Sequence, residues 1–282
     1  MSETLNPPFG HYALPARQEA WRKGAERFGD TRWGRTRISL SRKRAMAGRD
    51  EPYDVEIDTG VKARLYPSEN RCEKRAFCGA QIWDTQERQA LKEAIGKAET
   101  PFVFLDVGAN VGLYSLFVNA YAIKAARPAR IIAIEPSLET CARLEANIAA
   151  NKATIQIIRS AISDEPGAGF LGGGETNRGE AHLMSGGHDV EPVVVDTLAR
   201  ICFANGLTNI NAMKLDIEGH DLKALKGFFD DAPIKLHPDL LIVETSKDKN
   251  SPIVELCETH NYMVSRHSGL NSILTKRPHG ET

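Results

Sequence analysis

The sequence predicts an α/β fold in which helices cover both faces of a mostly parallel sheet. From Phe102 onward, apolar runs of strand length alternate with segments of helical periodicity; this order is typical of a parallel sheet wrapped by helices. The first run, residues 102–107, leads into a small-residue loop and then a helical pattern. Sheets of this class usually bind nucleotide-like ligands at such a junction. With 282 residues, 41% of them hydrophobic, the chain can form one large domain with an extension.

Seven strands and the helices between them follow from these patterns. Strands are expected over residues 102–107, 130–135, 154–159, 210–216 and 239–244, with two closing strands near 262–265 and 272–276. Helices are expected over residues 112–125, 137–150, 197–205, 219–229 and 250–260. The Gly-rich segment between Pro166 and Pro192 is interpreted as an irregular insertion, and it is expected near the ligand crevice.

Two smaller elements are expected before this core. Residues 53–67 alternate apolar and polar side chains around Thr59 and Gly60, which predicts a β-hairpin. Residues 87–97 have a helical pattern that ends before Pro101. We therefore expect one domain over residues 51–282, with the hairpin and helix in 51–100 and the catalytic core in 101–282.

Residues 1–50 form a basic extension that is rich in Arg and Lys and poor in apolar runs. They are expected to be helical near residues 17–28 and otherwise loosely ordered. The extension is interpreted either as a solvated arm or as a contact for an anionic surface, whether a membrane headgroup, a nucleic acid or an acidic glycan.

Composition excludes several classes of protein. The formal net charge of −1 argues against a molecule that binds polyanions with its whole surface, so nucleic acid is not an expected substrate. No apolar run has the length of a membrane span, and no secretory signal begins the sequence, so a cytoplasmic protein is expected. Five dispersed cysteines fit reduced thiols. The histidines lack metal-ligand spacing, and although Asp216, Glu218 and Glu244 have the oxygen atoms to hold a hard cation, nothing in the sequence requires a metal.

The loop after the first core strand carries the first candidate site, with Asp106, Gly108, Asn110 and Gly112 as its proposed binding residues. The two glycines permit backbone angles and close approaches that a Cβ would block. Asp106 at the strand end would repel a diphosphate but attract a positively charged ligand without phosphates, such as S-adenosyl-L-methionine.

Two further segments are candidates for the same ligand. Glu135 ends the second strand, 23 residues after Gly112, and is followed by Pro136; an acid at this spacing can accept hydrogen bonds from two ribose hydroxyls. After the third strand, Ala161 leaves room for a flat adenine and Asp164 has an acceptor for its exocyclic amine. An ordinary surface acid and a plain turn are the alternatives for these two segments.

The fourth strand ends in a cluster of ionisable residues that are candidate catalytic groups: Lys214, Asp216, Glu218 and His220. Carboxylate, imidazole and amine groups beside the crevice are the parts needed to remove a proton from a hydroxyl. The alternative is that Asp216 or Glu218 caps the following helix. Glu244 ends the fifth strand and is expected in the same region.

Together these residues resemble the FkbM-type family of S-adenosylmethionine-dependent methyltransferases. The matching blocks include LDVGANVGLYS at 105–115, IEP at 134–136, SAISD at 160–164, VVVDTL at 193–198 and KLDIEG at 214–219. The resemblance implies a Rossmann-like, seven-stranded methyltransferase fold with an antiparallel last strand. It also implies transfer of a methyl group, usually to oxygen, with Asp106, Gly108, Asn110 and Glu135 binding the cofactor. Residues 1–50 lie outside it.

The sequence therefore predicts an S-adenosyl-L-methionine-dependent O-methyltransferase that acts on a hydroxyl of a sugar, glycan or small metabolite. The expected general base is His220 or Asp216, with Glu218 positioning it. Substrate contacts are expected from the 166–192 insertion and the N-terminal hairpin. Two other functions stay open at this point: an NAD-dependent oxidoreductase on the same fold, and a non-catalytic binding module with a vestigial cofactor site.

Overall fold

The fold begins with a pair of helices that pack against each other. A computed structural model describes residues 7–99, 101–172, 182–184, 191–217, 219–245 and 251–277. Helix α1 (Ala16–Gly24) leads through a short 3-10 turn, η1 (Ala25–Arg27), to helix α2 (Arg32–Met46). The expectation of loose order after residue 28 is wrong for α2, because Gly34, Ile38, Ser41 and Ala45 recur at helical spacing and are buried as one face.

A buried arginine joins this helical pair to the rest of the molecule. Arg22 of α1 is 3% exposed, and its guanidinium donates hydrogen bonds to the main-chain oxygens of Glu56 and Phe77. Part of the basic extension is therefore a structural element and not a solvated arm.

The predicted hairpin is present as strands β1 (Tyr53–Asp58) and β2 (Val61–Leu65), which pair antiparallel. The predicted helix near residues 87–97 is α4 (Thr85–Lys97). Between them lie helix α3 (Arg71–Phe77) and the 3-10 turn η2 (Ala80–Ile82), which the sequence patterns did not indicate. Helix α3 begins where the Asn70 side chain accepts hydrogen bonds from the main-chain nitrogens of Cys72 and Glu73.

The seven-stranded, mostly parallel sheet is confirmed, in the order β12-β13-β11-β10-β3-β4-β5. Strands β10, β3, β4, β5 and β11 run parallel, and β13 pairs antiparallel with both β11 and β12. The strand bounds are β3 (Phe102–Val107), β4 (Ala129–Ile134), β5 (Ile155–Ile158), β10 (Ala212–Leu215), β11 (Leu240–Glu244), β12 (Tyr262–Ser268) and β13 (Asn271–Lys276).

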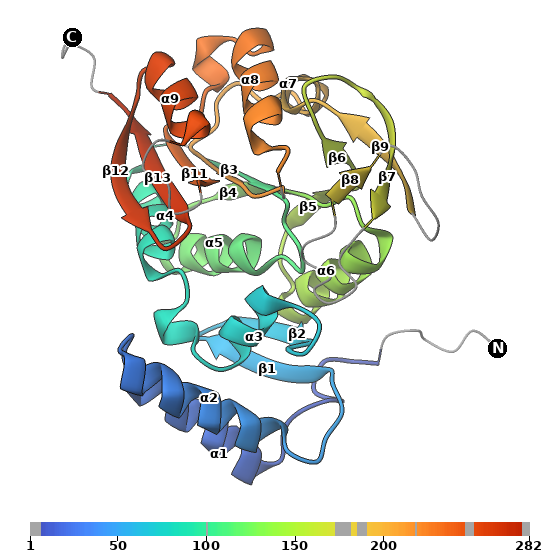
Figure 1. Cartoon of the computed structure of the whole chain (residues 1–282), viewed down its shortest axis with the longest axis vertical. Coiled ribbons are helices and arrows are strands. Elements are labelled where there is room, and N and C mark those ends of the chain that lie inside the picture. The colour runs from blue at the N-terminus through green and yellow to red at the C-terminus, as the bar shows by residue number, and fades with distance from the viewer. Residues whose placement is uncertain are drawn as a thin grey trace.

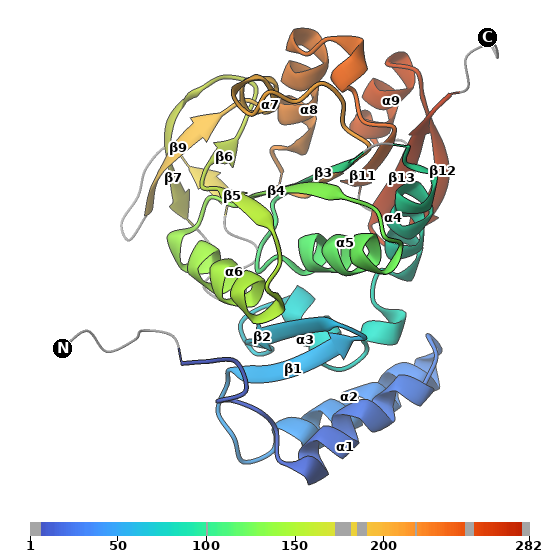
Figure 2. The same cartoon turned by 180° about the vertical axis from the view of Figure 1, so that it is seen from behind.

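Helices cover both faces of this sheet, as predicted (Figure 1). Alternate residues of β3 point to opposite faces: Phe104 belongs to the core on the α5 side, whereas Leu105 belongs to the core on the α8 side. The hairpin and the α1–α2 pair lie beyond α5 and α6, at the end of the molecule away from α7, α8 and α9 (Figures 1 and 2). The helix bounds are α5 (Leu113–Lys124), α6 (Leu138–Asn151), α7 (Leu198–Ala204), α8 (Asp221–Asp231) and α9 (Pro252–Thr259), with a 3-10 turn η4 (Ile234–Leu236).

The 166–192 insertion is not irregular where it is described. A second sheet forms there in the order β6-β9-β7-β8. Leu171, Val193 and Val195 fill its small core. The sequence pattern did not predict β7, because its glycines interrupt the alternation of apolar and polar side chains that is typical of a strand. The remainder of the insertion lies outside the described residues. The strand bounds are β6 (Ala161–Ile162), β7 (Gly167–Gly172), β8 (His182–Met184) and β9 (Glu191–Asp196).

In the part of the chain that the structure describes, no helix is both long and apolar enough to cross a membrane.

Candidate functional site

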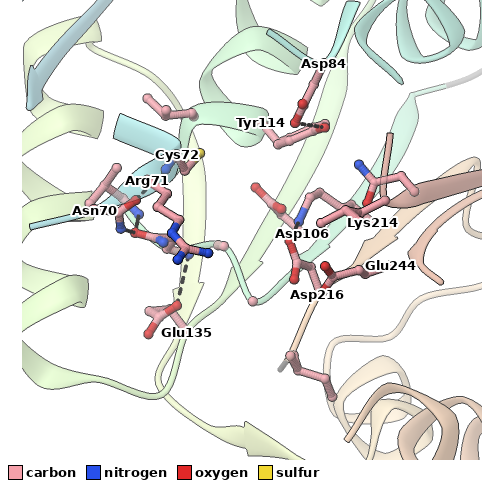
Figure 3. A pocket seen from close by; sticks show the side chains of 18 of the residues that line it. Asn70, Arg71, Cys72, Asp84, Asp106, Tyr114, Glu135, Lys214, Asp216 and Glu244 are labelled. Carbon is pink, nitrogen blue, oxygen red and sulfur yellow. Dashed lines mark hydrogen bonds and ion pairs between the residues drawn. The ribbon is translucent and has the colours of Figure 1, made fainter. Parts of the chain in front are cut away.

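A pocket of about 690 Å³ lies at the carboxyl ends of the parallel strands. The loops after β3, β4, β10 and β11 form one of its walls, which is the position expected for a ligand in an open α/β sheet. The opposite wall comes from α3, the start of α4 and the turn between β12 and β13. Figure 3 shows Asp106, Lys214, Asp216 and Glu244 gathered at one side of this pocket.

The glycine loop after β3 is held against the loop after β10. Gly108 has φ +75°, and a Cβ at this position would lie 1.8 Å from the main-chain oxygen of Asp216. Gly112 has φ +82°, and its Cβ would lie 2.1 Å from Leu144 Cδ1. The Asp216 main chain excludes any Cβ at position 108, and the positive φ favours glycine at both positions. Gly108 and Asn110 line the pocket, whereas Gly112 is not among the lining residues and acts by letting α5 begin close to α6.

Asp106 is buried at the end of β3 and lines the pocket. Its Oδ2 accepts hydrogen bonds from the main-chain nitrogen of Ser115 at 3.0 Å and from Ser115 Oγ at 2.7 Å. Burial raises the pKa of Asp106 to about 6, although Lys214 and the Ser115 hydrogen bonds oppose this. The carboxyl group is thus held rigidly by the first turn of α5.

Glu135 follows β4 and is 8% exposed. One carboxylate oxygen accepts from the main-chain nitrogen of Asn110 at 2.9 Å, and the other accepts from that of Ser137 at 3.1 Å. Burial raises the pKa of Glu135 to about 7, despite these two bonds. Pro136 lines the pocket beside it. Arg71 from α3 points toward Glu135 across the pocket (Figure 3).

Lys214 and Asp216 form an ion pair of 2.8 Å at the end of β10. Burial by itself would lower the pKa of Lys214, but the charges of Asp216 and Asp106 outweigh it and raise that pKa. Lys214 therefore stays protonated and cannot take a proton from a substrate. Its Nζ also lies 5.0 Å from the centre of the Tyr114 ring.

Asp221 accepts the main-chain hydrogen bonds of the turn before α8, and Asp216 does not. The Asp221 carboxylate oxygens accept from the main-chain nitrogens of Ile217 at 3.0 Å and Gly219 at 3.2 Å. Asp216 is consequently left facing the pocket together with His220. Neither ring nitrogen of His220 is bonded to any described residue, and Nδ1 is buried. Glu218 lies outside the described residues.

The two residues proposed for adenine differ in position. Ala161 lines the pocket, next to Ser160. Asp164 is exposed, accepts a hydrogen bond from Ser163 Oγ at 2.8 Å, and is not among the lining residues.

The opposite wall contains residues that sequence reasoning missed. Asp84 precedes α4 with φ +43°, a left-handed conformation that aspartate adopts more readily than most residues, and accepts a hydrogen bond of 2.8 Å from the Tyr114 hydroxyl. Buried Glu87 accepts from Ser268 Oγ at 2.9 Å and Asn271 Nδ2 at 2.8 Å, which fixes the β12–β13 turn over the pocket. Among the described residues, the 166–192 insertion contributes only Leu171 to the lining and the β1–β2 hairpin contributes none.

Comparison with known proteins places the chain in a family. The methyltransferase FkbM domain matches residues 106–276. Two curated relatives are 26% identical to the chain: the AMB antimetabolite synthetase AmbE of Pseudomonas aeruginosa over 206 residues, and the hexuronic acid methyltransferase AglP of Haloferax volcanii over 153 residues. These matches cover 58% and 52% of this chain but only 10% of AmbE and 60% of AglP.

Solved structures with similar folds include several methyltransferases. The SAM-dependent methyltransferase of Agrobacterium tumefaciens is 14% identical with a TM-score of 0.45, covering 82% of this chain and 70% of that one. The precorrin-6y C5,15-methyltransferase of Geobacter metallireducens is 12% identical with a TM-score of 0.40, covering 68% and 87%. The family match spans more than half of the chain, from the acid of the glycine loop to the last strand of the sheet. The protein therefore belongs to the FkbM methyltransferase family.

Proposed function

We propose that this protein uses S-adenosyl-L-methionine to methylate a hydroxyl oxygen of a sugar or other small metabolite. The observation that carries the proposal is the strand-end wall of the pocket, where two buried carboxyl groups stand beside a lysine–aspartate pair and an unpartnered histidine. The name of AglP, a hexuronic acid methyltransferase, supports a sugar as the acceptor.

The pocket suits a positively charged adenosyl cofactor. Asp106 and Glu135 would hold it, and Gly108 and Asn110 line the same part of the pocket. When bound, S-adenosyl-L-methionine supplies a methyl group on positively charged sulfur. An acid at position 106 disfavours the diphosphate of NAD in the same place.

The residues of this chain then have two tasks: to orient the acceptor oxygen and to accept its proton. Asp216, fixed by Lys214, is placed to accept a hydrogen bond from the acceptor hydroxyl. His220 lines the same region, and its Nε2 would take the proton as the oxygen is methylated. The buried Nδ1, which no described residue binds, would keep its own hydrogen in that step.

Methyl transfer can be tested without knowing the acceptor. The purified protein is incubated with cofactor labelled in the methyl group and with a metabolite extract of the source cells, and the labelled product is isolated. We expect a product whose label resists both mild alkali and acid, as an ether does. Label released by alkali as methanol would indicate a carboxyl ester, and label on nitrogen an amine acceptor; either result, or no transfer, would contradict the proposal.

Cofactor affinity should depend on pH with a defined sign. Because the pKa values of Asp106 and Glu135 are raised to about 6 and about 7, both carboxyl groups gain protons as the pH falls through this range. Protonation removes the negative charges that attract the cofactor. We expect its Kd to increase at least about tenfold from about pH 8 to about pH 5.5. Titration calorimetry measures this, with circular dichroism to show that the protein stays folded; a Kd that is constant over the range would argue against both assignments.

A further inference from the structure

The two walls of the pocket carry opposite charge. The strand-end wall is acidic: it contains Asp106, Glu135, Asp216 and Glu244 with Lys214 as the balancing cation. The N-terminal wall contains Arg35, Arg71 and Arg75 with Asp30 and Asp84. The acidic wall fits a cationic cofactor. The carboxylate of the cofactor can engage only one of these guanidinium groups, so the basic wall has charge left for a second anionic ligand.

The acids of the N-terminal wall are already engaged. Asp30 accepts hydrogen bonds from Arg35, through Nε and, at 3.0 Å, through Nη2. These bonds hold the pKa of Asp30 below its usual value, and the nearby charge of Arg75 contributes in the same direction. Asp84 accepts the hydrogen bond from the Tyr114 hydroxyl described above. Arg75 itself forms no hydrogen bond or ion pair with the residues that the structure describes.

Helix α3 holds two of these arginines in register. Arg71 and Arg75 are four residues apart and lie on one helical face, while Glu73, Ala76 and Phe77 are buried on the other side. The start of α3 is tied to the cofactor loop, because Asn70 Nδ2 donates to Asn110 Oδ1 at 3.0 Å. The arginines therefore have a fixed position relative to the strand-end wall, and Arg71 projects toward Glu135 across the pocket (Figure 3).

We propose that the methyl acceptor carries an anionic group, a carboxylate or a phosphate, which Arg75 binds together with Arg71 and Arg35. Guanidinium groups bind both kinds of oxyanion through paired hydrogen bonds. The acceptor hydroxyl then faces Asp216 while the anionic group faces the N-terminal wall. This inference rests on the proposed methyl transfer, and it adds a substrate class that the strand-end residues do not define.

Fractionating the acceptor tests the inference separately from the reaction. A metabolite extract is divided on an anion exchanger into retained and unretained pools, and each desalted pool is incubated with the protein and methyl-labelled cofactor. We expect label transfer with the retained pool. Transfer only with the unretained pool would overturn the anionic acceptor but leave methyl transfer standing, whereas transfer with neither pool would overturn methyl transfer as well.

The source of the charge follows from treating the retained pool with alkaline phosphatase. Loss of methyl-acceptor activity after this treatment indicates that the anionic group is a phosphate monoester. Acceptor activity that survives the treatment and still depends on Arg75 indicates a carboxylate.

Matched variants on α3 test the role of Arg75. With the retained pool as substrate, Arg75→Gln should raise the half-saturating amount of acceptor at least about tenfold, with kcat and cofactor Kd nearly unchanged. Arg75→Lys should recover part of the loss. The control is Lys74→Gln, which removes one positive charge from the neighbouring exposed position outside the pocket lining. Equal acceptor saturation for Arg75→Gln and Lys74→Gln would overturn the assignment.

Discussion

Replacing Glu135 by alanine is expected to weaken binding of S-adenosyl-L-methionine by roughly a hundredfold or more. Both carboxylate oxygens accept main-chain hydrogen bonds, from Asn110 and Ser137, so the side chain also shapes the glycine loop. Its loss removes an acceptor for ribose hydroxyls and two bonds that order the backbone beneath them. A charge-assisted hydrogen bond is typically worth about 1.5–3 kcal/mol, and two of them account for the expected factor. Asp106→Ala should have a similar effect, because it deletes the buried charge beside Lys214.

Titration calorimetry with S-adenosyl-L-methionine measures both variants. Glu145→Gln is the matched control, because Glu145 is an exposed acid on α6 that does not line the pocket. Thermal unfolding establishes that each variant is folded at the temperature of the titration. If both Glu135→Ala and Asp106→Ala bind S-adenosyl-L-methionine with unchanged affinity, these residues do not bind the cofactor.

The strand-end wall could be predicted from the sequence because its residues follow from local rules. Asp106 and Glu135 each end an apolar run, and the carboxyl ends of parallel strands meet at one edge of the sheet. The prediction of a close backbone approach at Gly108 is confirmed by its contact with the Asp216 main chain. The sequence indicated Asp216 and Glu218 as possible caps of the next helix, whereas Asp221 accepts the main-chain hydrogen bonds of that turn.

The opposite wall could not be predicted because it depends on contacts between distant segments. Ser268 and Asn271 are fixed over the pocket by Glu87, which precedes them by more than 180 residues, and by the pairing of β13 with β11. Arg35 lines the pocket because α2 packs through a face rich in small residues. These Gly, Ser and Ala residues have low hydropathy, so the sequence gives no clear signal of an amphipathic helix there. The second sheet was not predicted for a related reason: the glycines of β7 have no side chains, so β7 lacks the alternating pattern of a strand.

The largest effect on turnover is expected from His220→Ala, which should lower kcat by about 10²–10⁴-fold, the usual contribution of a general base. Cofactor Kd should stay within about twofold, because His220 is proposed to act on the acceptor proton only. Asp216→Asn should lower kcat less and raise the acceptor KM, since an amide oxygen still accepts the hydroxyl hydrogen bond while Lys214 loses its partner.

Chemical rescue separates a base from a structural residue. Free imidazole should restore part of the activity of His220→Ala, because it can enter the space that the side chain leaves and accept the same proton. His11→Ala is the matched control, because His11 is exposed and does not line the pocket. If imidazole has no effect on the activity of His220→Ala, the proton passes to another group. Asp216 is then the group to test, because it lies on the same wall and its carboxylate faces the pocket.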